Sequence, residues 1–260
     1  MAETHLPTLL LLPGLLCDAA LWRHQVAALR GHARCVTADL TQDATLEGMA
    51  ARALDGMPDR FALAGLSMGG YAALQIMRMA PERVTALCLM DTSARADTAE
   101  QARRRRGLVA LVRLGGRFRG VTPRLLPQLL HPANLADPAL CQDVIAMADR
   151  VGQDAYLRQM EAILGRPDSL ALLPCIRVPT LVAVGEADAM TPPDLSMEMA
   201  GAIPGAVLHT IPDAGHLPPL EQPETVSRLL QLWLQQAAAG PVGGARPYPT
   251  GAGRAPGRIG

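Results

Sequence analysis

Short apolar runs alternate with longer amphipathic stretches over the first ninety residues of the chain. Brief apolar runs between turn residues are typical of buried strands, whereas apolar positions three and four apart indicate helices. The pattern predicts strands at Thr8–Leu12, Cys35–Ala38, Phe61–Gly65 and Thr85–Met90, with helices between them at Ala19–Arg30, Thr45–Gly56 and Ser67–Ala80.

The same alternation returns after Pro179. It predicts two further strands, Thr180–Gly185 and Ala206–Ile211, and two helices, Asp194–Ile203 and Pro223–Gln236. Strand–helix–strand units of this length imply parallel strands joined by right-handed crossovers. The expected fold class is therefore α/β, with a mostly parallel central sheet and helices on both faces.

The stretch from residue 93 to 173 has helical signals without strand signals. Asp97 and Glu100 have the spacing of a capping box, Asp137 precedes a helix-starting proline, and Gly165 is a stop signal. We expect residues 93–173 to form a helical lid inserted into a core made of residues 1–92 and 174–239. Residues 240–260 are rich in Gly, Pro, Ala and Arg, which predicts a disordered tail.

The composition indicates a globular protein, because 49% of the 260 residues are hydrophobic and 18% are charged. The net charge is zero, which gives no reason to expect nucleic-acid or membrane-surface binding. The five cysteines are scattered without CxxC spacing, so neither a disulfide framework nor a zinc site is indicated. The apolar run Leu9–Leu12 is too short for a signal core or a membrane span. We expect a cytoplasmic protein.

The segment Gly65-Leu66-Ser67-Met68-Gly69 lies between a predicted strand and a predicted helix. A GxSxG sequence in this context indicates a nucleophile elbow, a strained turn that presents the serine hydroxyl at the edge of the sheet. Glycine at positions 65 and 69 avoids collisions with the crossing backbone. Ser67 is therefore the candidate nucleophile.

A serine hydroxyl is a weak nucleophile, so it needs a base and a group that orients the base. Asp188 follows one predicted strand and His216 follows the last, which brings both to the sheet edge that carries Ser67. We assign His216 as the base and Asp188 as the acid. Other acids remain possible, namely Asp91, after the Thr85–Met90 strand, and the nearby Glu186 and Asp213. The histidines at positions 5, 24, 32 and 209 are poorer candidates for the base.

An acyl-transfer site also needs hydrogen-bond donors for the oxyanion. We assign the backbone N–H of Met68, directly after the nucleophile, and that of Leu15 in the loop after the first strand. Cys17 lies in the same loop, but no base is placed beside it, so we interpret it as a pocket or core thiol.

These motifs resemble those of lid-bearing α/β-hydrolases, which include bacterial carboxylesterases, 3-oxoadipate enol-lactonase and the pimeloyl-carrier-protein methyl ester esterase. The resemblance covers residues 6 to 237 and rests on Leu12-Pro13-Gly14, Gly65 to Tyr71, Pro81-Glu82-Arg83-Val84, Gly185 with Asp188 and Pro192, and Gly215-His216 followed by Glu221-Gln222-Pro223. It implies a carboxylic ester hydrolase that works through an acyl-enzyme, without cofactor or metal. Alternatives are a lactonase, a carrier-protein ester hydrolase or, outside enzymes, a hydrolase-fold ligand receptor.

Substrate choice is expected to depend on the lid, where eight arginines and no acidic residue lie between Arg103 and Arg124. Arg103, Arg106, Arg113 and Arg117 can share one helix face. Such a run is typical of a solvated surface. It also suits an anionic substrate or a carrier protein, and both interpretations stay open.

Overall fold

The computed structural model describes residues 6–115 and 118–239. Six strands form one sheet in the order β2-β1-β3-β4-β5-β6, and every neighbouring pair is parallel. The strands are β1 (Thr8–Leu12), β2 (Arg34–Thr37), β3 (Phe61–Leu66), β4 (Val84–Met90), β5 (Thr180–Gly185) and β6 (Val207–Ile211). The expected α/β fold class is confirmed. The predicted tail, residues 240–260, lies outside the described residues.

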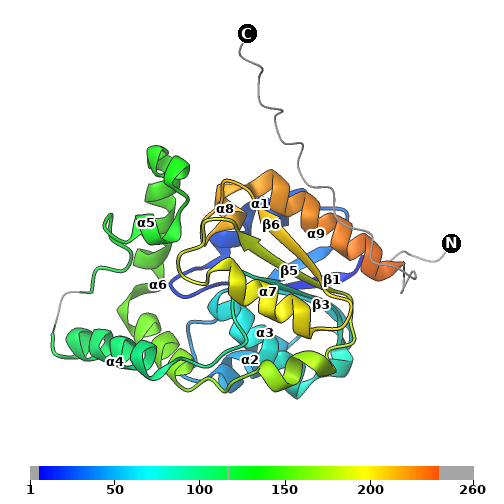
Figure 1. Cartoon of the computed structure of the whole chain (residues 1–260), viewed down its shortest axis with the longest axis horizontal. Helices are drawn as coiled ribbons and strands as arrows, with labels where there is room; N and C mark the ends of the chain where they lie inside the picture. Colours follow the sequence, from blue (N-terminus) through cyan, green and yellow to red (C-terminus); the bar gives the residue numbers. More distant parts are fainter. Residues whose placement is uncertain (1–5, 116–117, 240–260) are drawn as a thin grey trace, which may run out of the picture.

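Helices cover both faces of the sheet (Figure 1). One face carries α1 (Arg23–Ala28), α8 (Pro218–Glu221) and α9 (Pro223–Ala238), and the other carries α2 (Leu46–Leu54), α3 (Met68–Met79) and α7 (Pro193–Ala202). In β1, Leu9 and Leu11 belong to the core under α9, whereas Leu10 and Leu12 belong to the core under α3. All four leucines are fully buried because successive strand side chains point to opposite, equally covered faces.

The helix predicted at Ala19–Arg30 is shorter than expected. The Asp18 side chain accepts from the N–H of Ala20 and starts a 3₁₀ turn, η1 (Ala19–Trp22), which α1 follows. A second turn, η2 (Pro81–Arg83), leads into β4.

A helical insertion, which we define as residues 93–173, separates β4 from β5. It contains α4 (Ala99–Arg113), α5 (Leu126–Leu129), η3 (Pro132–Ala136), α6 (Pro138–Leu164) and η4 (Leu170–Cys175), and its three α-helices lie to one side of the sheet (Figure 1). The α6 helix begins at the Asp137 cap, as predicted, and is broken by a non-helical residue at Gly152.

The start of α4 differs from the prediction. Thr98, and not Asp97, caps the helix, and its partner in the capping box is Gln101. The Asp97 carboxylate instead accepts from Arg105. Because this buried ion pair competes for the aspartate, the helix cap lies one residue later than predicted.

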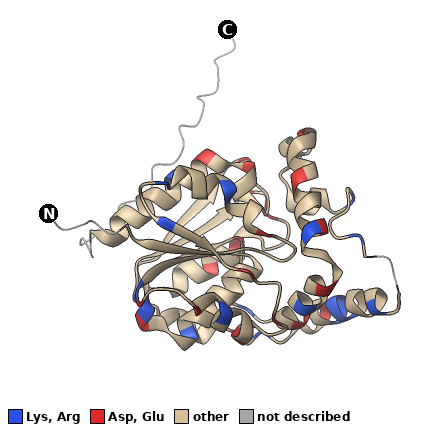
Figure 2. Ribbon diagram, turned by 180° about the vertical axis from the view of Figure 1, so that it is seen from behind, with Lys and Arg blue, Asp and Glu red and all other residues tan. Residues whose placement is uncertain are grey.

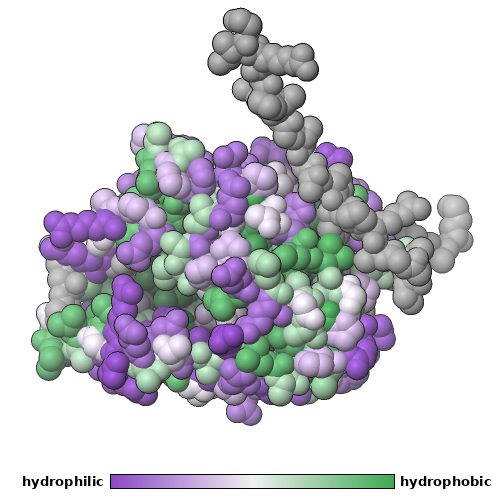
Figure 3. All heavy atoms as spheres, in the orientation of Figure 1, coloured by the Kyte–Doolittle hydropathy of each residue, from purple (hydrophilic) through white to green (hydrophobic). Residues whose placement is uncertain are grey.

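Much of α4 faces solvent. Val109 is its buried residue, whereas Leu108, Leu111 and the C-cap residue Leu114 are exposed. Apolar surface gathers at the lower left of Figure 3, where Figure 1 places α4. No helix of the described ranges, 6–115 and 118–239, is long and apolar enough to cross a membrane.

Candidate active site

Strained backbone gathers at the carboxyl edge of the sheet. Within the described ranges, the non-glycine residues with positive φ are Leu16, Ser67, Asp91 and Asp213. They follow β1, β3, β4 and β6 respectively. Such conformations cost free energy and persist where the surrounding structure enforces them, which occurs often at functional sites. This edge is therefore the candidate site.

Ser67 forms the turn between β3 and α3, with φ 54° and ψ −115°. Its N–H donates to the carbonyl of Met90 on the neighbouring strand, 3.0 Å away. A Cβ atom at Gly65 would collide with the backbone of Gly69, and one at Gly69 would collide with the carbonyl of Leu12. The two glycines thus allow β1, β3 and α3 to approach closely enough to hold the serine in this strained turn.

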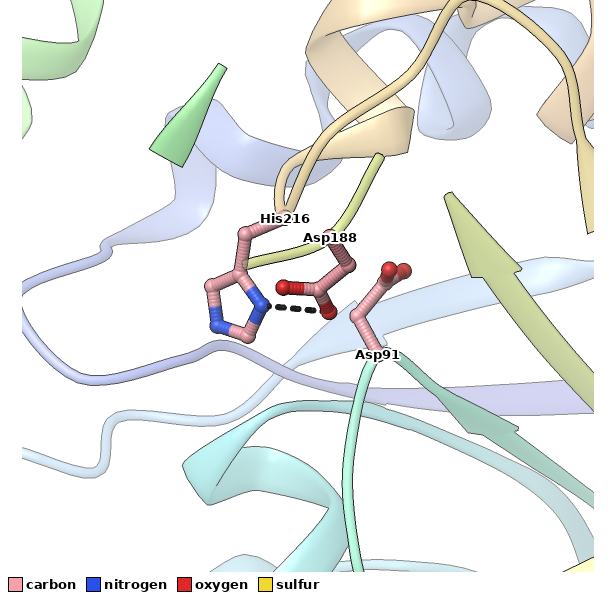
Figure 4. A group of neighbouring side chains, drawn as sticks. All are labelled: Asp91, Asp188 and His216. Atoms are coloured by element: carbon pink, nitrogen blue, oxygen red, sulfur yellow. Dashed lines mark hydrogen bonds and ion pairs between the residues drawn. The ribbon is translucent and has the colours of Figure 1, made fainter. Parts of the chain in front are cut away.

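The side chains of Ser67, His216 and Asp188 form a hydrogen-bonded chain. His216 Nε2 lies 2.9 Å from Ser67 Oγ. His216 Nδ1 lies 2.8 Å from Asp188 Oδ2, a contact that Figure 4 shows as a dashed line. Asp188 also accepts from the N–H groups of Met190 and Thr191 and from the Thr191 hydroxyl, at 2.8, 3.0 and 2.6 Å. Each carboxylate oxygen is thus engaged, which fixes the acid's orientation toward the imidazole.

The environment of Asp188 favours its charged form. Burial acts to raise the pKa of this carboxyl, but the charge and hydrogen bond of His216 and the donors of Thr191 outweigh burial and hold the pKa below its usual value. An ionised Asp188 can then hold the Nδ1 proton of His216, which leaves the Nε2 lone pair directed at the Ser67 hydroxyl.

The three alternative acids occupy other positions. Asp91 is fully buried and its Oδ1 accepts from the N–H of Gly185 at 2.8 Å. Burial, together with the charge of Asp188, raises the pKa of Asp91 well above its usual value, which favours a neutral acid. Glu186 accepts from the N–H of Asp213, and both of these residues are exposed. Within the described residues, none of the three hydrogen-bonds to His216.

A buried glutamate that the sequence reasoning did not assign as a site residue shapes the His216 loop. Glu221 Oε1 accepts from the N–H groups of Gly215 and Leu217, on either side of the histidine, at 2.9 and 3.1 Å. Its other oxygen accepts from the N–H of His131 at 2.7 Å and from the Asn134 amide at 2.9 Å. Glu221 thereby ties the histidine loop to the helical insertion. Its presence in the Glu221-Gln222-Pro223 motif was the signal available in the sequence.

The two backbone groups predicted as oxyanion donors belong to residues beside the Ser67 pocket: Met68 directly follows Ser67, and Leu15 lines the pocket. Met68 is the first residue of α3, so its N–H has no intrahelical partner. In the loop after β1, the N–H of Leu16 donates to Gln159 at 3.1 Å and that of Cys17 to the carbonyl of Gly14. The N–H of Leu15 donates no hydrogen bond to the part of the chain that the structure describes, and this leaves it available for a ligand.

A pocket adjoins Ser67 and His216 and is bounded by the sheet edge and the insertion. Most of its wall is apolar; the lining residues are Gly14, Leu15, Leu16, Cys17, Leu66, Ser67, Tyr71, Arg105, Val121, Leu125, Leu129, Val144, Met147, Ile163, Met190, Thr191, His216 and Leu217. Burial raises the pKa of the Cys17 thiol to about 12, so this side chain is a poor nucleophile at neutral pH.

The arginines of α4 divide between surface and pocket. Arg103, Arg106 and Arg113 are exposed along the helix, whose basic bands are visible in Figure 2, and Arg113 pairs with Glu161. Arg117 lies outside the described residues. Arg105 was not singled out from the sequence, yet it is the α4 arginine that reaches the pocket. A run of four consecutive arginines gives no signal for which one turns inward.

Two groups of side chains have atoms close enough to consider a metal ion: Asp91, Asp188 and His216, and the surface group His131, Glu186 and Asp213. In the first, the Asp188 oxygens already accept the four hydrogen bonds described above. In the second, Glu186 Oε1 accepts from the N–H of Asp213. The hydrogen bonds of Asp188 account for the first arrangement. In the second, His131 Nε2 lies 3.9 Å from Glu186 Oε1.

A serine held in a strained strand–helix turn of a parallel sheet, with helices on both faces, defines the α/β-hydrolase class. The chain belongs to the alpha/beta hydrolase family, whose pattern matches residues 9–229. It is similar in structure to an esterase of Thermogutta terrifontis solved with malate bound, with 32% identity, a TM-score of 0.82, and coverage of 90% of this chain and 91% of that one.

Two further relatives are similar in sequence. A pimeloyl-[acyl-carrier protein] methyl ester esterase of Neisseria meningitidis is 29% identical over 64% of this chain and 66% of its own length. A Mycobacterium tuberculosis protein whose name describes a non-heme bromoperoxidase is 32% identical over 78% of this chain and 84% of its own length. Family membership and these relatives support hydrolase activity.

Proposed function

We propose that this protein is a serine hydrolase of carboxylic esters, with Ser67 as nucleophile, His216 as general base and Asp188 as the orienting acid. The observation that carries the proposal is the chain of hydrogen bonds from Ser67 Oγ through His216 to Asp188, 2.9 and 2.8 Å long, at a strained strand–helix turn. The esterase names of two relatives point to the same bond type.

The proposed reaction proceeds through an acyl-enzyme. Ser67 Oγ attacks the ester carbonyl carbon while His216 Nε2 takes the hydroxyl proton. The tetrahedral oxyanion accepts hydrogen bonds from the N–H groups of Met68 and Leu15. His216 then gives its proton to the departing alcohol, and a water molecule, activated by the same imidazole, hydrolyses the acyl-Ser67 ester.

The helical insertion, residues 93–173, would act as a lid over a core of residues 1–92 and 174–239. Its side chains supply part of the pocket wall, including Val121, Leu125 and Val144. An apolar wall of this kind suits the hydrocarbon part of a small-molecule ester. A lactone or the ester of an acyl-carrier protein would use the same chemistry, and the Neisseria relative makes the carrier-linked ester the second candidate.

The test is hydrolysis of 4-nitrophenyl esters together with labelling by a fluorophosphonate. Ser67→Ala is expected to abolish both, because the nucleophile is removed, while the circular dichroism spectrum stays unchanged. Ser196→Ala is a matched control. Its hydroxyl is buried and has no hydrogen-bond partner among residues 6–115 and 118–239, and its helix, α7, contributes none of the pocket's lining residues.

Retained hydrolysis by the Ser67 variant would refute the assignment of the nucleophile. Absence of turnover by the unmodified protein across acyl esters, methyl esters and lactones, with ligand binding intact, would favour the receptor alternative.

A further inference from the structure

One guanidinium group lines a mostly apolar pocket. Among the described lining residues, Arg105 is the one side chain with a permanent charge. Arg105, on α4, and Tyr71, on α3, both line the pocket. Tyr71 lies one helical turn beyond Ser67, the proposed nucleophile. A charged group on the wall of an apolar cavity is costly unless it has a partner, so its surroundings indicate what the pocket accepts.

The partners of Arg105 leave a positive charge in excess. Arg105 Nε donates to Asp97 Oδ2 at 2.8 Å, and Arg166 Nη1 lies 2.9 Å from Asp97 Oδ1. One carboxylate thus faces two guanidinium groups. The side chains of Asp97 and Arg166 are 5% and 6% exposed, whereas that of Arg105 is 23% exposed, so Arg105 is the member of this cluster that a ligand can reach.

The free edge of Arg105 matches an anionic oxygen group. Its Nη1 lies 3.9 Å from Met160 Sδ, a weak acceptor, and its Nη2 donates no hydrogen bond within the described ranges. Arg166 is held separately, with its guanidinium carbon 4.3 Å from the centre of the Tyr71 ring. Arg105 therefore keeps unsatisfied N–H groups on both Nη atoms, in the planar arrangement that binds a carboxylate bidentately.

We propose that the cluster of Asp97, Arg105 and Arg166 is an anion subsite, and that the preferred substrate is an ester with a carboxylate separated from the scissile carbonyl by an apolar chain. The apolar wall between Arg105 and Ser67 holds the chain, and Arg105 holds the carboxylate. This inference rests on the proposed ester hydrolysis at Ser67.

Binding is tested separately from catalysis by titration calorimetry on the Ser67→Ala protein with the monomethyl and the dimethyl ester of adipic acid. The charged monomethyl ester is expected to bind more tightly than the neutral diester. Arg105→Gln, introduced into the same protein, is expected to weaken binding of the monomethyl ester about ten- to a hundredfold. Arg105→Lys, which keeps the charge but not the planar pair of donors, should fall between.

Catalysis is tested with the 4-nitrophenyl monoester of adipic acid and the matched 4-nitrophenyl hexanoate. The ratio of their kcat/KM values should fall about ten- to a hundredfold in Arg105→Gln, chiefly through KM, and stay unchanged in the control Arg103→Gln on the exposed face of α4. An ester with the carboxylate on the alcohol side, such as 4-(hexanoyloxy)butanoate, is the comparison substrate. The dependence of its kcat/KM on Arg105 shows whether the alcohol half or the acyl half of the substrate carries the charge.

Equal binding of the monomethyl ester by the Arg105 and Arg103 variants would overturn the subsite, whatever the activity. The subsite is also refuted if Arg105→Gln lowers kcat/KM equally for the charged and the neutral substrate, because Arg105 would then be structural. Arg105-dependent binding without turnover of any ester would instead overturn the proposed function and leave the anion subsite standing.

Discussion

Gln159 offers a test of how the helical insertion supports the loop after β1, residues 13–17, which we call the oxyanion loop because it carries the proposed donor Leu15. This side chain on α6 is fully buried. Its Oε1 accepts from the N–H of Leu16 at 3.1 Å, and its Nε2 donates to the carbonyl of Leu40 at 3.2 Å. Leu16 has a φ of 60° and directly follows Leu15, whose N–H is the proposed oxyanion donor. Gln159 therefore holds the strained loop in place from the helical insertion.

The substitution Gln159→Leu removes both hydrogen bonds at a nearly constant side-chain volume. It leaves the Leu16 N–H and the Leu40 carbonyl buried without partners, at about 1–3 kcal/mol each. The expected loss of unfolding free energy is thus about 2–6 kcal/mol, to be compared with about 5–15 kcal/mol for the whole of an ordinary domain. If the loop relaxes and Leu15 moves, one oxyanion donor is lost. The largest fall in kcat expected from that loss is about 10²- to 10³-fold.

The assay combines urea unfolding with steady-state hydrolysis of 4-nitrophenyl butyrate at 10 °C, where the variant is folded. We expect kcat to fall at least tenfold and KM to change little, because the oxyanion forms only in the transition state. Gln153→Leu, at an exposed position of the same helix, is the matched control. A Gln159→Leu protein that is less stable but retains kcat within about twofold would refute the link to the oxyanion loop.

Three further predictions concern titratable groups. Asp188→Asn is expected to lower kcat about 10³- to 10⁴-fold, because the imidazole loses its orienting acceptor. Asp91→Asn should retain activity within about tenfold. The reverse order of effects would move the acid role to Asp91. The raised pKa of Asp91 means that its contribution to stability is full below its ordinary pKa, near 4, and is lost as the pH rises toward the folded-state value. Urea unfolding from pH 4 to 9 should therefore show the Asp91→Asn variant gaining stability relative to the parent as the pH rises, and a constant difference would contradict the buried-acid interpretation. Iodoacetamide at pH 8 should alkylate the exposed Cys175 and spare Cys17, whose pKa is about 12; peptide mapping with Cys17 labelled first would disprove the burial argument.

Local sequence pattern was sufficient for the fold class. Apolar runs such as Thr8–Leu12 and Thr180–Gly185 can be buried on both faces only between two helical layers, so the parallel sheet follows from their spacing. Pattern also selected Ser67, Asp188 and His216, because parallel strands end at one edge and residues just after different strands must meet there. The order of strands and the displaced cap at Thr98 were not readable, since both depend on competition among distant contacts.

The supporting residues of the site were decided by tertiary structure alone. Gln159 lies 143 positions from Leu16 in the sequence, yet the two residues share a buried hydrogen bond. Arg105 lies 61 positions from Arg166, yet both pair with the carboxylate of Asp97. No periodicity distinguishes Arg105 from its three arginine neighbours, because the helix places all four within one turn and only the packing of α4 against the pocket turns one inward. Sequence by itself selected the candidate reactive residues, through motifs whose backbone requirements are local. The tertiary structure decided what surrounds them, because charge balance and hydrogen-bond satisfaction in a buried pocket are properties of the assembled chain.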